Sequence, residues 1–400
     1  MEEAKLPPAA QTNVLVQGCT EVETRDELER RIASKERLSV KFGIDPTGSE
    51  LHLGHAVVLH KMQQFVELGH RVVLLIGDFT ARIGDPTGRN ESRPLLSDAE
   101  IAENMRTYRE QAGKVLDLER VEIAYNSTWL APLTLADLIG LMKQTTVAQM
   151  LSRNDFAIRY AAGVPIALHE FLYPITQAYD SVAMRCDVEL GGSDQYFNLL
   201  LGREYQKHAG QPPQICMTTP ILEGTDGVVR MGKSRGNYVA LTEPASEQFG
   251  KLMRIPDGIM PRYAELAAFW SPAQVEALRG GLAAGTHNPI EEKKRLAEDI
   301  VARYHGRDDA RAARDRFEST VQRRELPTDM PELRADGVQK LSDLLVRSGF
   351  AKSRREAERL IEGGGVKVDG VVAIADAPWS QAAPVVLSLG VRRFVRVLPE

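Results

Sequence analysis

The segment from Asp45 to His55 combines side chains that suit the binding of a phosphate chain. It reads Asp-Pro-Thr-Gly-Ser-Glu-Leu-His-Leu-Gly-His, so the imidazoles of His52 and His55 follow the Thr47 hydroxyl closely. A helix that begins here would add free backbone N–H groups and a partial positive charge, which favour anions. Gly54 would let a flat ring approach the backbone. The alternative is that both histidines are ordinary surface or core residues.

A second candidate lies much further along the chain, where Arg230-Met-Gly-Lys-Ser234 is followed by Arg-Gly-Asn. The ammonium of Lys233, on a glycine-flanked loop, could follow a polyphosphate as negative charge develops on it. Taken alone, a short basic tract of this kind is more often a solvated loop. Its interpretation therefore depends on the pairing with the first segment.

Short apolar runs alternate with helical patterns along the first half of the chain. Strands are predicted for Ser39 to Ile44, Arg71 to Ile76 and Val121 to Tyr125, and helices for Gly54 to Leu68 and Ser97 to Leu116. This alternation predicts a doubly wound, mostly parallel sheet of the α/β class. Ligands of such sheets bind at the carboxyl ends of the strands, so the motif residues should gather at that edge.

The second half of the chain has a different pattern. From Glu243 to about Thr320 we predict helices and no strand, with well-formed helices over Ile290 to Tyr304 and Arg311 to Val321. The stretch Leu326 to Pro331 contains two prolines and is typical of a linker. The chain therefore changes from alternating strands and helices to helices alone, and then to a separate small module.

That module should combine two helices with a small sheet. A helix over Leu341 to Val346 precedes a second helix, which a Ser353–Glu356 capping box opens and Gly363 to Gly365 end. Val366 to Val372 is predicted to be a hairpin around an Asp-Gly turn, and a last strand covers Arg393 to Val397.

Bulk composition narrows the class of protein. The 400 residues suggest two or three domains, and 43% hydrophobic with 26% charged residues are typical of a soluble globular protein. No apolar run is long enough for a membrane span, and Met1 to Thr12 lacks the apolar region of a secretory signal. Three scattered cysteines fit a reducing cytoplasm, and without a CxxC pair or an HExxH motif we expect no zinc.

Charge is distributed unevenly along the chain. A net charge of −5 argues against nucleic-acid binding over the whole surface. Residues 339–400, however, hold ten Lys/Arg and seven acidic residues, a net +3 that leaves −8 for the rest. A basic tail on an acidic body is a hint of contact with RNA.

The motifs, taken in order, resemble those of class I aminoacyl-tRNA synthetases and, within that class, bacterial tyrosyl-tRNA synthetases. In the class, segments similar to His-Leu-Gly-His and Met-Gly-Lys-Ser bind ATP jointly. The segments between them that look like tyrosyl-enzyme motifs are Gly77-Asp-Phe-Thr80 with Gly84-Asp-Pro-Thr-Gly-Arg89, Tyr173-Pro-Ile-Thr-Gln177-Ala-Tyr-Asp180, and Leu190-Gly-Gly-Ser-Asp-Gln195 with Asn198. The resemblance covers almost the whole chain.

The resemblance implies that the chain activates tyrosine with ATP and transfers it to the terminal adenosine of tRNA(Tyr). Because the attacking carboxylate is already an anion, the protein must align two anions and spread the leaving-group charge. ATP would be a substrate with Mg²⁺ on its phosphates, and no protein-bound metal is expected. The implied protein is a cytoplasmic homodimer with no membrane partner.

Three domains follow from the same resemblance. Residues 1–240 would be a Rossmann-like catalytic domain and residues 241–330 an all-α domain on the anticodon side. Residues 338–400 would be an α+β RNA-binding module of the kind shared with ribosomal protein S-four. Its RNA-binding surface would surround the capped helix, with Lys352, Arg354, Arg355 and Arg359. The alternative is a solvated helical face.

Roles at the tyrosine site carry over residue by residue as what the resemblance implies. Tyr173, Gln177 and Asp85 would hold the tyrosine ammonium. Asp180 would accept a hydrogen bond from the phenol, unless it is a buried structural carboxylate capped by helix donors. Gln195 would lie near the tyrosine carboxylate. The implied tyrosine-binding set is Thr80, Asp85, Tyr173, Gln177, Asp180 and Gln195.

Roles at the ATP site carry over in the same way. Asp194 would bind the ribose, and Arg89 and Arg93 would be mobile basic residues that help to stabilise pyrophosphate. The implied catalytic set is Thr47, His52, His55, Lys233, Arg89 and Arg93. The implied ATP-binding set is Asp45, His52, Gly54, His55, Gly192, Asp194, Met231, Lys233 and Ser234.

The sequence departs from the family pattern at two places. Lys41 stands where many relatives have an aromatic residue that helps to hold the phenol, and we expect it to be an ordinary strand-end lysine. Arg230 and Gly232 replace lysine and serine, which keeps the charge but changes its geometry and loosens the loop. Two other functions stay open: a tryptophanyl enzyme, and a paralogue that binds RNA without catalysis.

Overall fold

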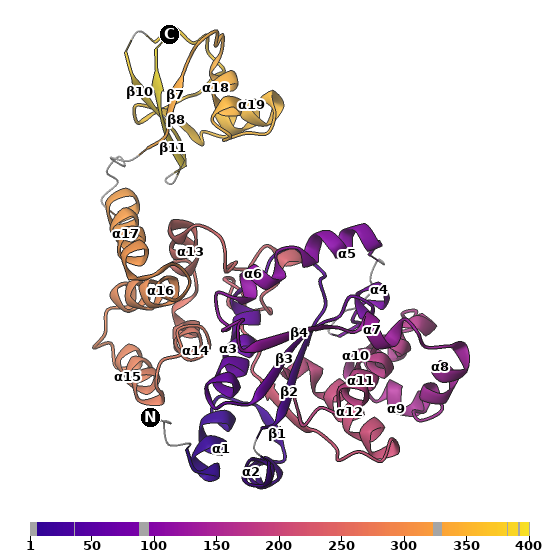
Figure 1. Cartoon of the computed structure of the whole chain (residues 1–400). Helices are drawn as coiled ribbons and strands as arrows, with labels where there is room; N and C mark the ends of the chain where they lie inside the picture. Colours follow the sequence, from indigo (N-terminus) through magenta and orange to yellow (C-terminus); the bar gives the residue numbers. More distant parts are fainter. Residues whose placement is uncertain are drawn as a thin grey trace. The chain divides into compact units, whose positions relative to one another are not determined.

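The computed structural model describes residues 6–35, 37–87, 96–322, 330–381, 383–390 and 393–399. The chain forms two compact units, which we describe separately (Figure 1). Unit 1 comprises Met1–Pro244 and Lys251–Tyr304, and unit 2 comprises Ala245–Gly250 and His305–Glu400.

Unit 1 is built on a six-stranded sheet with the order β1-β6-β5-β2-β3-β4. The strands are β1 (Glu21–Glu23), β2 (Ser39–Ile44), β3 (Arg71–Ile76), β4 (Val121–Tyr125), β5 (Val188–Gly192) and β6 (Ile215–Thr219). Neighbours are parallel except β1, which is antiparallel to β6. Strands β3, β5 and β6 are almost entirely buried, as expected of a parallel sheet covered on both faces. The predicted doubly wound sheet is confirmed.

The connections explain where a ligand can enter the sheet. Helix α3 (Leu53–Glu67) connects β2 to β3, whereas α12 (Tyr196–His208) connects β5 to β6 in the opposite direction across the sheet. Right-handed crossovers then place the two helices on opposite faces of the sheet (Figure 1). The direction of winding reverses between β2 and β5, so a crevice opens at the carboxyl ends of these two strands.

The remaining helices of unit 1 surround this sheet and extend beyond it. They are α1 (Pro8–Val16), α2 (Arg25–Ser34), α4 (Thr80–Ile83), α5 (Asp98–Met105), α6 (Tyr108–Ala112), α7 (Ser127–Leu130), α8 (Leu135–Met142), α9 (Val147–Leu151), α10 (Asn154–Ala161), α11 (Leu172–Met184), α14 (Met260–Leu266), α15 (Pro272–Ala283) and nearly all of α16 (Pro289–His305). Short 3₁₀ turns are η1 (Leu168–Phe171), η2 (Ser193–Gln195), η3 (Lys233–Arg235) and η4 (Asp257–Ile259).

The single helix predicted from Ser97 to Leu116 is wrong, because the chain forms α5 and α6 with a break between them. Thr107, at the break, donates from its hydroxyl to the Ser49 carbonyl at 3.1 Å. Gln111 also donates to that carbonyl, at 2.7 Å. The broken helix therefore supports the loop that precedes α3.

Unit 2 contains most of α13 (Ala245–Leu252), α17 (Arg307–Phe317) with a π-helical turn over Glu318–Gln322, and a C-terminal module. The module has a five-stranded sheet in the order β7-β11-β10-β8-β9. Its elements are β7 (Glu332–Arg334), α18 (Leu341–Arg347), α19 (Arg354–Glu362), β8 (Val366–Val368), β9 (Val371–Val372), β10 (Val385–Leu389) and β11 (Arg393–Leu398). An apolar core joins the two helices to the sheet.

Several predictions for this half of the chain can be judged. The hairpin is confirmed, because β8 and β9 pair around Asp369 and Gly370, whose φ angles of 44° and 81° suit a type I′ turn. The capping box is only half right, since Ser353 accepts from Glu356 N while the Glu356 carboxylate accepts from Lys352 N. Helix α17 begins four residues earlier than predicted. No strand occurs over 243–320, all described, but most of the predicted linker lies outside the described residues.

None of the described helices is both long enough and apolar enough to cross a membrane.

Candidate active site

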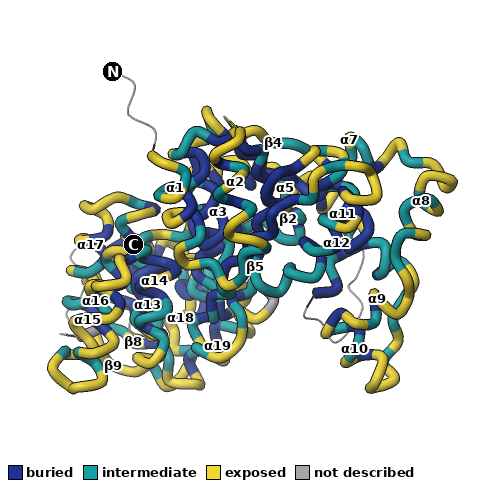
Figure 2. The backbone as a smooth tube through the Cα atoms, turned by 90° about the horizontal axis from the view of Figure 1, so that it is seen from below, coloured by how far each residue is buried: buried dark blue, intermediate teal, exposed yellow. Residues whose placement is uncertain are grey.

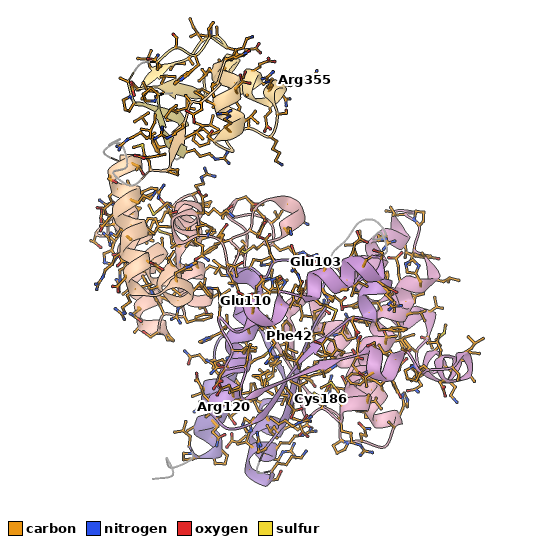
Figure 3. The ribbon with its side chains drawn as sticks, turned by 45° about the horizontal axis from the view of Figure 1, so that its top comes forward. Phe42, Glu103, Glu110, Arg120, Cys186 and Arg355 are labelled. Carbon is orange, nitrogen blue, oxygen red and sulfur yellow. The ribbon has the colours of Figure 1, made fainter. Side chains whose placement is uncertain are left out.

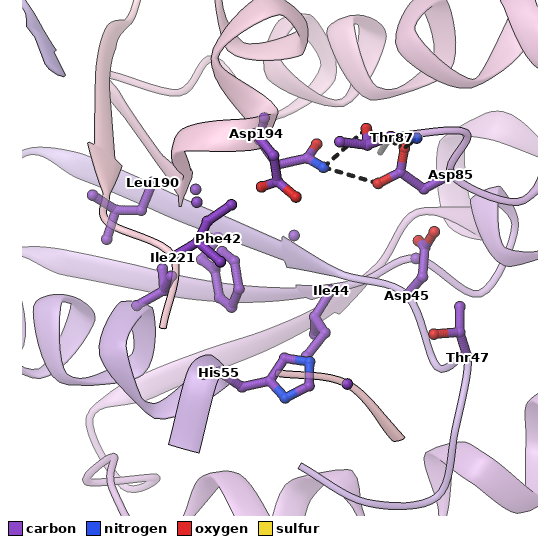
Figure 4. Close-up of a pocket in the computed structure, with 18 of the residues that line it drawn as sticks. Phe42, Ile44, Asp45, Thr47, His55, Asp85, Thr87, Leu190, Asp194 and Ile221 are labelled. Carbon is purple, nitrogen blue, oxygen red and sulfur yellow. Dashed lines mark hydrogen bonds between the residues drawn. The ribbon is translucent and has the colours of Figure 1, made fainter. Parts of the chain in front are cut away.

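A cavity of about 720 Å³ lies at the carboxyl ends of β2 and β5, within unit 1. The predicted tyrosine and ATP residues that line it are Asp45, Thr47, His52, Gly54, His55, Thr80, Asp85, Tyr173, Gln177, Asp180, Gly192, Asp194, Gln195, Met231 and Lys233. Figure 4 shows Asp45, Thr47, His55, Asp85 and Asp194 around this space. Arg89 and Arg93 lie outside the described residues, as does the side chain of Ser234.

Backbone hydrogen bonds bring together the two segments that are predicted to bind phosphate. Leu53 N donates to Val239 O at 3.0 Å, and Leu241 N donates to Leu51 O at 2.9 Å. His52 and Ala240 form an antiparallel bridge between them. We call residues 230–234, around Lys233, the lysine loop. The start of α3 is therefore fixed to the chain that follows this loop, although the two segments are distant in sequence.

The two histidines lie at the N-terminus of α3 and act as neutral groups. His52 is the N-cap residue, and its backbone N–H donates to Nδ1 of His55 at 3.2 Å. Burial lowers the pKa of His55 to about 4, and burial together with His55 lowers the pKa of His52 well below its usual value. Because Nδ1 of neutral His55 accepts, its proton is on Nε2. The imidazoles thus offer hydrogen bonds, not charge, to a phosphate.

Gly54 is required by close packing at this helix start. A Cβ at this position would lie 3.1 Å from two atoms of the His52 ring and 3.8 Å from the Met231 Cβ. Any side chain at Gly54 would therefore displace the His52 imidazole. The expectation that Gly54 lets a flat ring approach the backbone stays a prediction, because the ring found next to it is the protein's own His52 imidazole.

Two cations of the lysine loop, Lys233 and Arg230, contact different parts of the cavity wall. Lys233 Nζ lies 3.0 Å from Ser49 Oγ and 3.4 Å from Glu50 Oε2, both within the segment from Asp45 to His55. Arg230 Nη1 lies 2.7 Å from Asp194 Oδ2, after β5. Both pairs are partly exposed, so they are screened by solvent and contribute little to stability.

An amide and carboxylate network lies where the resemblance places the tyrosine ammonium. Asp85 Oδ1 accepts from Thr87 N at 2.9 Å, and its Oδ2 accepts from Gln195 Nε2 at 2.8 Å. Figure 4 marks the contacts of Asp85 and Thr87 with dashed lines. Asn198 Nδ2 donates to both Gln195 Oε1 and Gln177 Oε1, at 2.8 and 3.0 Å. Both glutamines are therefore held in one orientation around a negative centre.

Asp45 ties the first strand to this network. Thr80 Oγ1 donates to Asp45 Oδ1 at 2.7 Å, and Tyr173 also hydrogen-bonds to Asp45. Burial, with Asp45 and Asp85 nearby, raises the pKa of Tyr173 well above its usual value, so its phenol stays protonated. A Cβ at Gly77 would lie only 2.0 Å from Asp45 Oδ1, which explains the glycine.

Asp180, on α11, is a buried carboxylate that faces the cavity, with 3% of its surface exposed. Trp129 Nε1 donates to its Oδ1 at 2.8 Å and Asn126 Nδ2 to its Oδ2 at 3.3 Å. Burial raises the pKa of Asp180 to about 6, although Lys41 and these two donors lower it. The sequence analysis missed Asn126 and Trp129. Their signal was their position directly after β4, at the same edge of the sheet.

The expectation that Lys41 is an ordinary strand-end lysine is wrong. Lys41 lies inside β2, is 1% exposed, and its Nζ is 3.1 Å from Glu189 Oε1 on the neighbouring strand β5. Burial lowers its pKa, but Glu189 and Asp180 more than offset this and leave it above the usual value. A lysine at this depth needs such a partner.

The predicted RNA-binding residues lie apart from the cavity, in the C-terminal module. Lys352, Arg354, Arg355 and Arg359 are all exposed and lie on or just before α19. Figure 3 shows Arg355 at the surface of this helix. Arg354 pairs with Asp343 Oδ1 at 2.6 Å, whereas the structure gives no ion pair for Arg355 or Arg359 among the described side chains.

The residues that the structure describes include no group of three or more His, Cys, Asp or Glu side chains placed to hold a metal ion.

Comparison with known proteins gives a consistent result. The family profile described as tRNA synthetases class I (W and Y) matches residues 33–322, and that of the S4 domain matches residues 339–373. Tyrosine–tRNA ligase of Thermotoga maritima is 47% identical over 394 residues, which cover 98% of each chain. Tyrosine–tRNA ligase of Thiobacillus denitrificans is 49% identical over 385 residues, 95% of this chain and 97% of the relative.

Solved structures share the fold at lower identity. Tyrosyl-tRNA synthetase of Archaeoglobus fulgidus, complexed with L-tyrosine, aligns with a TM-score of 0.63 at 24% identity, over 77% of this chain and 99% of that chain. A C-terminally truncated mitochondrial tyrosyl-tRNA synthetase of Aspergillus nidulans also aligns with a TM-score of 0.63, at 23% identity, over 79% of this chain and 95% of that chain.

Proposed function

The chain belongs to the class I tRNA synthetases of the tryptophan and tyrosine group, and we propose that it is the tyrosine-specific enzyme. It would activate L-tyrosine with ATP to tyrosyl-adenylate and then transfer the tyrosine to the 3′-terminal adenosine of tRNA(Tyr).

The observation that carries the choice of tyrosine is the carboxylate of Asp180. It is buried, it faces the cavity, and its two oxygens are oriented by Trp129 and Asn126. A phenol O–H can donate to such an acceptor, whereas phenylalanine would offer no donor to the side of this buried carboxylate that faces the cavity. The indole N–H of tryptophan could also donate to Asp180, but the larger indole ring would have to fit between this carboxylate and the ammonium site.

Tyrosine would bind with its ammonium near Asp85, Tyr173 and Gln177. The Asp85 carboxylate and the ordered amides provide acceptors there, while the Tyr173 hydroxyl stays protonated. Gln195, which donates to Asp85, would lie beside the reacting carboxylate of the substrate. These contacts fix both ends of tyrosine and thereby align its carboxylate for attack.

In the first step, a carboxylate oxygen of tyrosine attacks the α-phosphorus of ATP. The bond between the α-phosphorus and the oxygen that bridges to the β-phosphorus breaks, and pyrophosphate leaves. No protein base is needed because the nucleophile is already ionised. His52 and His55 would donate hydrogen bonds to the triphosphate, and Lys233 would neutralise charge on the departing pyrophosphate. Mg²⁺ would arrive on the phosphates of ATP and help to neutralise the same charge.

In the second step, a ribose hydroxyl of the terminal adenosine of tRNA attacks the carbonyl carbon of the mixed anhydride, and AMP leaves. The exposed cations of α19 would bind RNA phosphates in this complex. The division into a catalytic domain over 1–240, a helical domain over 241–330 and an RNA-binding module over 338–400 belongs to this proposal. So does a cytoplasmic location.

We propose that the protein is a homodimer, because an apolar face of unit 1 lacks a partner within the described chain. Leu135, Ile139 and Met142 form one stripe of α8 and are 74%, 57% and 45% exposed. Helix α8 has no buried residue, and Figure 2 shows exposed and half-buried backbone along it. Val147 and Ile158, on the next two helices, are also exposed. A second copy of the chain can cover an exposed apolar face of this kind.

Amino-acid-dependent exchange of pyrophosphate into ATP tests this function. We expect rapid exchange with tyrosine, and little with tryptophan or phenylalanine. Exchange with tryptophan alone would make the chain a tryptophanyl enzyme. A folded protein that supports no exchange with any amino acid, yet binds tRNA, would be an RNA-binding paralogue.

A further inference from the structure

Lys41 and Glu189 form a buried ion pair near Asp180, the carboxylate that we propose selects the side chain of the amino-acid substrate. They are register partners on the parallel strands β2 and β5, and they are 1% and 2% exposed. Neither side chain lines the cavity, whereas Asp180 does. Any influence of the pair on a ligand must therefore act through the residues that do line the cavity.

The pair is bonded to α11 on both sides of Asp180. Lys41 Nζ lies 3.5 Å from the Gln177 carbonyl, and Glu189 Oε1 accepts from Gln177 Nε2 at 3.2 Å. Glu189 Oε2 accepts from Ser181 Oγ at 3.0 Å and also from Gln214 Nε2. The two strands thus hold the turn of α11 that carries Asp180, together with the side chain of Gln177.

Packing alone does not require the charges of Lys41 and Glu189. Burying two ions is costly, and well-packed apolar residues of similar volume often stabilise a core equally well. Here the pair brings a cation close to Asp180, where it lowers the pKa that burial raises. Glu189 acts in the opposite direction but more weakly. The sign of each charge therefore has a separate effect on Asp180.

Among the described residues, the groups that donate hydrogen bonds to Asp180 are uncharged. These donors are Trp129 and Asn126. From α12, the amides of Asn198 and Gln206 bond to α11. Burial raises the pKa of the Cys186 thiol to about 12, so it is uncharged. Arg82, on α4, is exposed and pairs with Asp98.

Building on the proposed function, we propose that Lys41 is a positioning residue for tyrosine selection. Its cation favours the ionised form of Asp180, and together with Glu189 it holds the turn of α11 that carries Asp180, so that the pocket accepts a phenol donor and disfavours a side chain that lacks one. Lys41 itself does not touch the substrate, and its effect should therefore appear in the ionisation behaviour of Asp180.

The test compares Lys41→Met, Glu189→Gln and the double variant. In each we measure kcat/KM for tyrosine and phenylalanine in pyrophosphate exchange from about pH 5 to about pH 8.5, where the acid limb reports the free enzyme. Arg159→Met, which breaks the equally buried Arg159–Glu170 pair elsewhere in unit 1, is the matched control. It should lower stability without moving the acid limb.

We expect the two single variants to move the acid limb in opposite directions. Lys41→Met should raise its midpoint by about one pH unit or more, because a nearby cation is lost. Selectivity for tyrosine over phenylalanine should then fall about fivefold at about pH 6, since less Asp180 is ionised. Glu189→Gln should lower the midpoint. The double variant should fold better than Lys41→Met and keep a midpoint above that of the wild type.

A purely structural pair gives a different result. The single variants would then lose stability with unmoved acid limbs, and the double variant would return to wild-type behaviour; either outcome overturns the inference. If Lys41→Met does not fold, the downward shift in Glu189→Gln decides. A wild type that exchanges no pyrophosphate with tyrosine would instead overturn the proposed function, and the inference with it.

Discussion

The guanidinium of Arg230 lies 2.7 Å from the carboxylate of Asp194, the group that the family resemblance assigns to the ribose of ATP. The same guanidinium donates to the Thr87 carbonyl at 3.2 Å. Burial raises the pKa of Asp194, and Arg230 opposes this. The loop that carries Lys233 thus provides a partner for the same carboxylate that the ribose of ATP would use.

Replacing Arg230 should separate binding from catalysis. In Arg230→Gln the ribose no longer competes with a guanidinium, so KM for ATP should stay equal or fall by a factor of about 2 to 5, the value of a partly exposed ion pair. The rate constant kcat should fall about tenfold or more, because one of the cations that line the cavity is lost. Arg254→Gln, an exposed arginine of the same unit, is the control. A raised KM with unchanged kcat would contradict this account.

Removing the charge of Asp180 should lower selectivity. The amide of Asp180→Asn can orient either way between Trp129, Asn126 and the substrate, so a phenol no longer meets a fixed acceptor. Selectivity for tyrosine over phenylalanine should fall roughly 10- to 100-fold, the cost of a buried donor or acceptor without its partner. Pyrophosphate exchange with both amino acids measures this, with Glu204→Gln, an exposed acid on α12, as control. Unchanged selectivity would remove Asp180 from its assigned role.

Activity should depend on pH through the same carboxylate. Burial raises the pKa of Asp180 to about 6, so it loses its charge as the pH falls through that value. Activity with tyrosine should therefore decline about tenfold per unit below about pH 6, while activity with phenylalanine declines less. The histidines do not interfere, because the pKa of His55 is about 4 and that of His52 is lower than usual. A flat profile for tyrosine from about pH 5 to 7 would argue that the carboxylate is not needed in its charged form.

The same shift has a consequence for stability. An acid whose pKa is raised by folding stabilises the fold at low pH and loses that contribution as pH rises through the folded value. Ligand-free protein therefore carries an unfavourable carboxylate above about pH 6. A bound phenol would offset part of this cost. Added tyrosine should raise the unfolding temperature more at neutral than at acid pH.

Substitution of two exposed arginines on α19 should affect only the step that involves tRNA. Arg355→Gln with Arg359→Gln should raise KM for tRNA about tenfold and reduce its dependence on salt, since each phosphate contact contributes about one unit to that slope. Tyrosyl-adenylate formation without tRNA should be unchanged. Lys207→Gln, an exposed cation on α12, is the control. Equal losses in both steps would show that these arginines support the fold.

The apolar stripe of α8 gives a direct test of assembly. Leu135→Asp with Ile139→Asp places charges on the face that a second copy would cover, so the protein should sediment with the mass of one chain. Ile374→Asp, at an exposed apolar position of unit 2, should leave the mass unchanged. A wild type that is monomeric at all concentrations would contradict the homodimer.

Much of this architecture could be predicted because local pattern and global fold agree. Strands β2, β3 and β4 have the predicted bounds, since each is a short apolar run between turn residues. Residues that follow such strands meet at one edge of a parallel sheet, which is why so many motif residues line one cavity. The prediction of one continuous helix over 97–116 was wrong. Hydrogen bonds from Thr107 and Gln111 to Ser49 favour a break in the helix, which the hydrophobic periodicity does not reveal.

The inner part of the pocket was less predictable. The pairing of Lys41 with Glu189 follows from the register of β2 on β5, and no local pattern encodes that register. A lysine in a strand suggests an edge or an end, because lysine is rarely buried. Trp129 could have been noticed because it follows β4 closely, but its contact with Asp180 depends on how α7 packs against α11.

A crystal structure with a non-hydrolysable analogue of tyrosyl-adenylate would test the central claim most directly. The account predicts the phenol oxygen within hydrogen-bonding distance of Asp180, the ammonium beside Asp85, and the phosphate near the start of α3. It also predicts that the contact between Arg230 and Asp194 is broken and that Asp194 binds the ribose instead. An analogue bound with its phenol in solvent, or in a cavity that Asp180 does not line, would contradict the proposed function.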